Sequence, residues 1–182
     1  MAGDGTETVD IMITRTYSPE DFRACARLMT ASDPWITLGL NYNICLKSIT
    51  APLREVYIAR SGGKIAGILI LQMTGVFKGY IQTICVAPHA RGKGLGTSLL
   101  KFAEKRIFSK SPNVFLCVSS FNRKALKLYK RLGYNKAGVL KDFIVAGRHE
   151  LLMRKTLCPL RNFYSRRRNN SRDIQCKPAA MR

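Results

Sequence analysis

Hydrophobic positions along the chain switch repeatedly between a period of two, typical of strands, and a period near 3.6, typical of helices. The alternation over 10–16 predicts a first strand. A first helix is expected to follow, with Ser18 as its N-cap and Pro19 at its first position. After a break at 33–35, a second helix is expected over about 36–49. The chain therefore opens with one strand and two helices.

The remainder of the chain predicts strands and helices in turn, separated by glycine- and proline-rich turns. Two strands form a hairpin across Ser61-Gly62-Gly63, a strong turn signal. The other expected elements are a central strand at 80–86, a helix at 98–108, a strand at 114–119, a helix at 122–131 and two strands at 134–145 and 150–157. The order β-α-α-β-β-β-α-β-α-β-β predicts a mixed α+β sheet flanked by helices.

A glycine-rich turn between the central strand and the next helix is the most informative stretch of the sequence. Alternating glycines at 92, 94 and 96 allow a tight turn in which several backbone N–H groups point the same way. These donors precede a helix, whose N-terminal end favours an anion. Arg91 and Lys93 add positive charge at the rim. The turn is therefore expected to hold a pyrophosphate.

Two blocks in a fixed order carry a family resemblance. In the first, the central strand leads into Val-x-Pro at 86–88 and then Arg-x-x-Gly-x-Gly, with an additional glycine at position 92. In the second, 122–134 follows the pattern Asn-x-x-Ala-x-x-x-Tyr-x-x-x-Gly-Tyr. A Walker motif does not fit, because Lys93 lies between glycines. The chain is identified as a member of the GNAT superfamily of N-acetyltransferases, which it resembles over roughly 13–157.

The resemblance implies both a fold and a reaction. The implied GNAT fold has a mixed, mostly antiparallel central sheet in which the parallel strands 4 and 5 splay apart, flanked by helices. The implied reaction transfers the acetyl group of acetyl-CoA, a cosubstrate, to a primary amine by direct attack in a ternary complex. No metal is implied.

The resemblance also assigns roles to particular residues. Backbone groups of the central strand are expected to bind the pantetheine arm, at Ile84, Cys85 and Val86. The turn is expected to bind the pyrophosphate, at Arg91, Gly92, Lys93, Gly94, Leu95, Gly96 and Thr97. Asn122 is expected to contact the cofactor as well as to cap its helix. Tyr129 is expected to lie near the coenzyme sulfur and to protonate the departing thiolate.

The sequence departs from the family at the general base. Many members carry a glutamate on the central strand, where this chain has Gln82 and no carboxylate. Relatives that acetylate a ribosomal-protein alanine carry a glutamate on the fifth strand, at the position of Cys117 here. The candidates that remain open are Glu55, Asp142, His149 and Glu150, or an ordered water held by Gln82.

The acceptor is expected to be a primary amine on a protein N-terminus, on a lysine or on a small molecule. The general resemblance to ribosomal-protein acetyltransferases favours a protein. The helical pair near the N-terminus is expected to overhang the acceptor side, as it does in the family. Trp35 and Tyr42 lie there, and they either anchor these helices to the sheet or contact the acceptor.

Composition limits the remaining possibilities. The 182 residues are 46% hydrophobic, which suits one domain with a substantial core, expected over 8–157. No apolar run is long enough to span a membrane, and the first residues do not resemble a secretion signal, so a cytoplasmic protein is expected. The six cysteines form no Cys-x-x-Cys pair and are expected to be reduced thiols.

The chain is strongly basic, with 31 basic and 11 acidic residues and a net charge of +20. Such a charge favours encounter with polyanions, including an anionic cofactor. Residues 158–182 are expected to form a mostly disordered basic tail, either solvated or in contact with a polyanion. The alternative to an enzyme is a binding module that retains the fold and acts on RNA or the ribosome.

Overall fold

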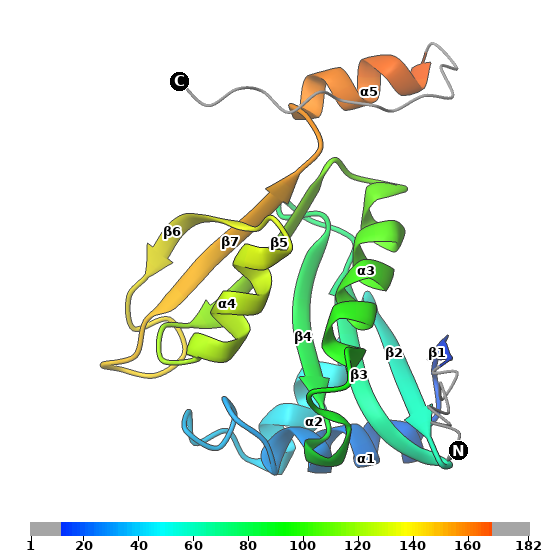
Figure 1. Ribbon diagram of the computed structural model, residues 1–182, viewed down its shortest axis with the longest axis vertical. Coiled ribbons are helices and arrows are strands. Elements are labelled where there is room, and N and C mark those ends of the chain that lie inside the picture. Colours follow the sequence, from blue (N-terminus) through cyan, green and yellow to red (C-terminus); the bar gives the residue numbers. More distant parts are fainter. Residues whose placement is uncertain (1–11, 169–182) are drawn as a thin grey trace, which may run out of the picture.

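A seven-stranded sheet forms the centre of the molecule in a computed structural model, which describes residues 12–168 (Figure 1). The strand order is β1-β2-β3-β4-β5-β7-β6, and all neighbours are antiparallel except β4 and β5. The strands are β1 (Ile13–Arg15), β2 (Arg54–Ser61), β3 (Lys64–Gln72), β4 (Tyr80–Val86), β5 (Asn113–Ser119), β6 (Asn135–Leu140) and β7 (Glu150–Thr156). The expected mixed α+β sheet with a parallel pair at strands 4 and 5 is confirmed.

The parallel strands β4 and β5 pair at one end only. Their register joins Tyr80 to Phe115 and Ile81 to Leu116, and β4 has no further partner in β5. Gly79 allows the close approach at the paired end, because a Cβ atom there would lie 2.5 Å from the carbonyl oxygen of Asn113. Beyond Ile81 the strands diverge (Figure 1). The splay that the family resemblance implies is therefore present.

Two pairs of helices cover opposite faces of the sheet (Figure 1). One core lies under α3 (Leu95–Phe108) and α4 (Arg123–Arg131), and the other under α1 (Pro19–Thr30) and α2 (Tyr42–Thr50). Strand β3 supplies both cores in alternation, with Leu69 and Leu71 on the α3 side and Ile68 and Ile70 on the other. Because both faces of β3 are covered, its sequence is apolar almost throughout rather than alternating with polar residues.

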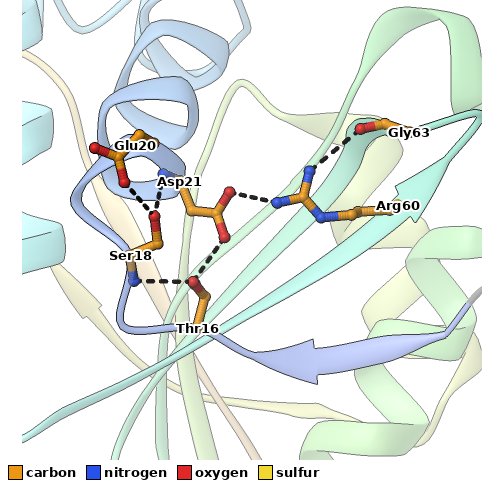
Figure 2. Close-up of polar contacts among 6 residues, drawn as sticks. All are labelled: Thr16, Ser18, Glu20, Asp21, Arg60 and Gly63. Atoms are coloured by element: carbon orange, nitrogen blue, oxygen red, sulfur yellow. Dashed lines mark hydrogen bonds and ion pairs between the residues drawn. The ribbon is translucent and has the colours of Figure 1, made fainter.

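A polar network at the start of α1 fixes that helix to the sheet (Figure 2). The Ser18 hydroxyl accepts from the backbone N–H of Asp21, which confirms the expected N-cap. The Asp21 carboxylate accepts a 2.7 Å hydrogen bond from Thr16 and forms an ion pair with Arg60 of β2. Arg60 also donates to the carbonyl of Gly63 in the β2–β3 turn. One carboxylate thus joins the helix to the hairpin.

Two expected boundaries differ by five or more residues from the structure. The second helix begins at Tyr42 rather than near 36, because Asn41 caps it by accepting from the N–H of Ile44 at 3.0 Å, and a series of turns occupies 31–39. Strand β6 ends at Leu140 rather than Val145. A loop follows instead, in which Asp142 has a positive φ of 52° and its carboxylate accepts from the N–H of Gly147.

The expected disordered tail is wrong for its first part. Helix α5 (Leu160–Arg168) forms there, at the end of the molecule away from the carboxyl end of β4 (Figure 1). Leu160, Phe163 and Tyr164 have the i, i+3, i+4 spacing of a helix face, and Phe163 is buried. Residues 169–182 lie outside the described residues, and the domain boundary at 157 stays a prediction. No helix in the described range 12–168 is both long and apolar enough to cross a membrane.

Candidate active site

A cleft of about 920 Å³ lies where β4 and β5 separate. The residues that line it come from both diverging strands, from the turn before α3, from the start of α4 and from two loops. Its walls include Ile84, Cys85, Val86, Arg91, Gly92, Gly94, Leu95, Gly96, Thr97, Asn122 and Tyr129. Of the residues expected at the cofactor, only Lys93 does not line the cleft in the described structure. The structure therefore brings the two sequence motifs together at one site.

The glycine-rich turn presents unpaired backbone donors to the cleft. Among the described residues, no backbone N–H from 92 to 97 donates to a protein acceptor. The N–H of Ser98 is the next along the chain, and it donates to the carbonyl of Gly94 at 3.1 Å. Gly92 and Gly94 have positive φ values of 78° and 83°, which explains the glycines. Helix α3 begins at Leu95, three residues before the expected start, so its first turn is part of this cradle. The arrangement suits an anion.

The end of β4 gives the cleft an exposed strand edge. A bulge leaves Gln82 without a Cα partner in β3, after which Ile84 and Cys85 pair with Leu69 and Ile68. On the other side β5 has already diverged, so backbone groups of β4 that point away from β3 have no strand partner. Burial raises the pKa of the Cys85 thiol to about 11, so this thiol stays protonated at neutral pH. An extended, amide-rich ligand fits this edge.

Tyr129 of α4 presents a hydroxyl that no described residue binds. The side chain is 5% exposed, and its ring lies 5.9 Å from that of Tyr134. Burial raises the pKa of Tyr129 above its usual value, so the phenol is protonated at neutral pH. At the start of the same helix, Asn122 accepts a 3.1 Å hydrogen bond from the N–H of Ala125, which confirms its capping role. A protonated donor therefore lines the cleft.

The candidates for the general base fall in different places. Glu55 accepts from Tyr57 and from Arg106, whose Nε atom lies 2.9 Å away, and it does not line the cleft. Asp142 is exposed and binds Gly147, and neither it nor His149 lines the cleft. Glu150 does line it, and so does Gln82, whose amide nitrogen donates to the carbonyl of Ser48 at 3.3 Å. Only these last two are placed to act on a ligand.

The turn before α2 and the loop after β6 complete the cleft. Trp35 lines it and also packs on the core beneath α1 and α2, whereas Tyr42 packs on that core only. Phe143 and Ile144 line the opposite wall although both are largely exposed. Sequence reasoning missed these two because it placed them inside a strand; two large apolar residues beside Asp142 and Gly147 were the available signal.

Comparisons with known proteins agree with this geometry. Residues 19–134 match the model of the acetyltransferase (GNAT) family. The chain is 32% identical to the N-alpha-acetyltransferase RimI of Mycobacterium tuberculosis over 155 residues, which are 82% of this chain and 94% of that protein.

Solved structures share the fold. The aminoglycoside 6′-acetyltransferase type Ii superposes with a TM-score of 0.67 at 20% identity, covering 81% of this chain and 98% of the other. The ribosomal-protein-S18-alanine N-acetyltransferase from Escherichia coli gives 0.63 at 18% identity, covering 82% and 95%. The chain belongs to the GNAT family of acetyltransferases and transfers the acetyl group of acetyl-CoA to an amine.

Proposed function

We propose that this enzyme acetylates the N-terminal α-amine of a protein. Support comes from the N-alpha-acetyltransferase of Mycobacterium tuberculosis, which is similar over nearly its whole length. The chemistry is also favourable, because an α-amine has a pKa of roughly 7.8 and a lysine amine one of roughly 10.4. At neutral pH an α-amine is therefore far easier to deprotonate for attack.

In this proposal the cofactor lies across the splayed strands. The unpaired N–H groups of 92–97 bind the pyrophosphate, with Arg91 and Lys93 adding charge at its rim, and this cradle is the observation that carries the placement of the cofactor. The free strand edge at Ile84, Cys85 and Val86 binds the pantetheine arm. Asn122 contacts the cofactor with its amide nitrogen. Tyr129 protonates the leaving thiolate.

Other readings are less well supported. A module that binds RNA or the ribosome without catalysis is not favoured, because such a module needs neither the cradle nor the unpartnered hydroxyl of Tyr129. A polyanion contact through the basic tail belongs to 158–182, most of which lies outside the described residues. We place the enzyme in the cytoplasm, a reducing compartment, because the described cysteines at 25, 45, 85 and 117 are free thiols.

A charge placed in the cradle tests the cofactor site. Gly96 lies in the first turn of α3, and a Cβ atom there meets Leu128 at 3.6 Å, an ordinary contact. Gly96→Glu should therefore fold, since an acidic residue is favoured in a first turn. Losing hydrogen bonds to a charged group should weaken acetyl-CoA binding on the order of 10- to 100-fold, as measured by calorimetry.

Gly96→Ala is the matched control, because it adds the carbon without the charge. It should bind acetyl-CoA nearly as tightly as the natural enzyme. The acceptor is tested separately by mass spectrometry, with a peptide that begins with alanine and contains one internal lysine. Acetylation at the lysine rather than at the terminus would contradict the proposed acceptor, and equal binding by both variants would contradict the proposed cradle.

A further inference from the structure

Glu150 differs from the other acidic residues that the structure describes. Four of them form ion pairs: Glu20 with Arg23, Asp21 with Arg60, Glu55 with Arg106 and Glu104 with Lys155. The exposed carboxylates of Asp33 and Asp142 accept hydrogen bonds in their own turns. Glu150 alone in this described set is buried, at 3% exposed, without a cation and beside the cleft. A strongly basic protein has thus kept one buried carboxylate unpaired at its candidate active site.

The surroundings of Glu150 leave one of its carboxylate oxygens without a hydrogen-bond partner. Ser119 of β5 forms a hydrogen bond with the side chain, while Oε1 is buried and has no partner among the described residues. Burying an acceptor in this way is unfavourable unless a ligand supplies the missing donor. The titratable groups that face it are the half-buried phenol of Tyr80 on β4 and the Cys117 thiol on β5. Burial raises the pKa of Glu150 above its usual value.

Strand register places Glu150 on the face of the sheet opposite Tyr129. Glu150 pairs with Ser119, and Cys117 is two residues away on β5, so all three side chains share one face. The intervening Val118 and its partner Leu151 belong to the α3 side, where Tyr129 also packs. Because β4 and β5 have separated here, the cleft connects both faces. A thioester lying in the gap would have the phenol on one side and the carboxylate on the other.

The register also brings Glu150 close to Cys117. Leu152 of β7 lies directly opposite Cys117 of β5, and Glu150 is two residues before it in β7. Diagonal neighbours on adjacent strands are about 7 to 8 Å apart, within reach of a long side chain. Glu150 is such a diagonal neighbour. It can therefore present a carboxylate to the region that position 117 faces.

We propose that Glu150 is the general base that deprotonates the acceptor amine, an inference that rests on the proposed function. Its carboxylate removes one proton from the ammonium group and later releases that proton to solvent. The neutral amine attacks the thioester, so that a C–N bond forms and the C–S bond breaks with its electron pair on sulfur. Sulfur takes the Tyr129 proton, and Tyr129 is restored by the second proton from nitrogen. Atoms and charge balance without another reactant.

Gln82 has a complementary role in this arrangement. Gln82 also lines the cleft, and its Oε1 atom is buried without a partner in the described structure. An amide oxygen is too weak a base to take the proton, but it can accept a hydrogen bond from the ammonium group. Gln82 is therefore a positioning residue that holds the amine between β4 and β7.

The test compares Glu150→Gln with the natural enzyme across pH 5.5 to 8.5. The readout is kcat/KM for a short peptide that begins with alanine. Loss of a general base should lower kcat/KM on the order of 100- to 10,000-fold near neutral pH. Without a general base the variant can use only the amine that is already deprotonated. Below the α-amine pKa of roughly 7.8, the free-amine fraction rises about tenfold for each pH unit. The ratio of kcat/KM between the natural enzyme and the variant should therefore fall by the same factor.

Two further variants separate catalysis from folding. Glu150→Asp keeps a carboxylate and should keep the pH profile of the natural enzyme at a lower rate. Glu55→Gln removes a buried, ion-paired carboxylate outside the cleft; it should lower stability and leave the shape of the pH profile unchanged. Calorimetry with acetyl-CoA is the folding check, and Glu150→Gln should bind it normally.

The outcomes are distinguishable. A Glu150→Gln variant with the natural pH profile would overturn the inference and leave the proposed function intact. Loss of acetyl-CoA binding in that variant would also overturn it, by showing that Glu150 maintains the structure. A natural enzyme that binds acetyl-CoA but acetylates no α-amine would instead defeat the proposed function itself.

Discussion

Single side chains at this site are recognisable because their polar atoms have no partner in the described protein. Tyr129, Gln82 and Glu150 all line one cleft, and the Tyr129 hydroxyl, Gln82 Oε1 and Glu150 Oε1 have no hydrogen-bond partner among the described residues. In the described part of the chain, buried polar atoms without a hydrogen-bond partner also occur outside the cleft, for example Ser32 Oγ and Arg54 Nε, but they do not gather at one cavity. Natural proteins seldom bury unsatisfied groups, so a cluster of them is a sign of ligand binding rather than of stability.

Tyr129→Phe tests this view, because the hydroxyl forms no bond that folding would lose. The free energy of unfolding should change by less than about 1 kcal/mol. Removing a general acid should nevertheless lower kcat on the order of 100-fold or more, with acetyl-CoA affinity nearly unchanged. Denaturant unfolding and steady-state kinetics on the same preparation measure both effects. A variant that loses stability and cofactor affinity together would assign Tyr129 a packing role instead.

The divergence of β4 and β5 is the feature of the secondary structure that creates the cleft. Their pairing is confined to one end, and Gly79 sits where the strands come closest. At φ 92°, a Cβ atom there would lie 2.5 Å from both the Asn113 carbonyl oxygen and the Ile107 side chain. The chain therefore has a steric reason for glycine that is independent of any ligand.

Gly79→Ala should be strongly destabilising for this reason. Left-handed backbone strain costs about 1–2 kcal/mol, and overpacking against backbone adds about 1–3 kcal/mol. Gly75→Ala is the control, since Gly75 has a similar φ of 82° but its nearest contact is 3.8 Å away. Urea unfolding measures the loss in the free energy of unfolding for each variant, and the difference between the two losses gives the cost of the steric clash at Gly79. Equal losses would show that close packing at the paired end is unimportant.

The sequence predicted those elements whose signals are local. The glycine-rich turn, the Ser18 cap and the motif containing Tyr129 are each contained within a few residues, and each is found where expected. Glu150 could be named only as one of several candidate bases, because its position depends on the register between β5 and β7. Residues 141–145 were wrongly placed in a strand because the apolar Phe143 and Ile144 mimic one. The register between distant strands leaves no local pattern in the sequence, and an exposed apolar loop leaves a misleading one.

At the scale of the whole molecule, excess positive charge is the dominant feature. The net charge is +20, and four of the acidic side chains in the described part of the chain are already neutralised by ion pairs. Arg91, Arg123 and Lys124 line the cleft itself. The field around the site therefore attracts the phosphates of acetyl-CoA and is screened by salt.

Acetyl-CoA binding should consequently weaken on the order of tenfold between 50 and 500 mM salt, because the Debye length shortens from beyond 10 Å to about 4 Å. S-acetylpantetheine carries the same thioester arm without phosphates, so its binding should hardly depend on salt. Titrations of both ligands at several salt concentrations, followed by calorimetry, separate the two contributions. Parallel salt dependence for both ligands would mean that salt acts on the protein fold. A dependence confined to acetyl-CoA would identify the basic surface as part of cofactor capture.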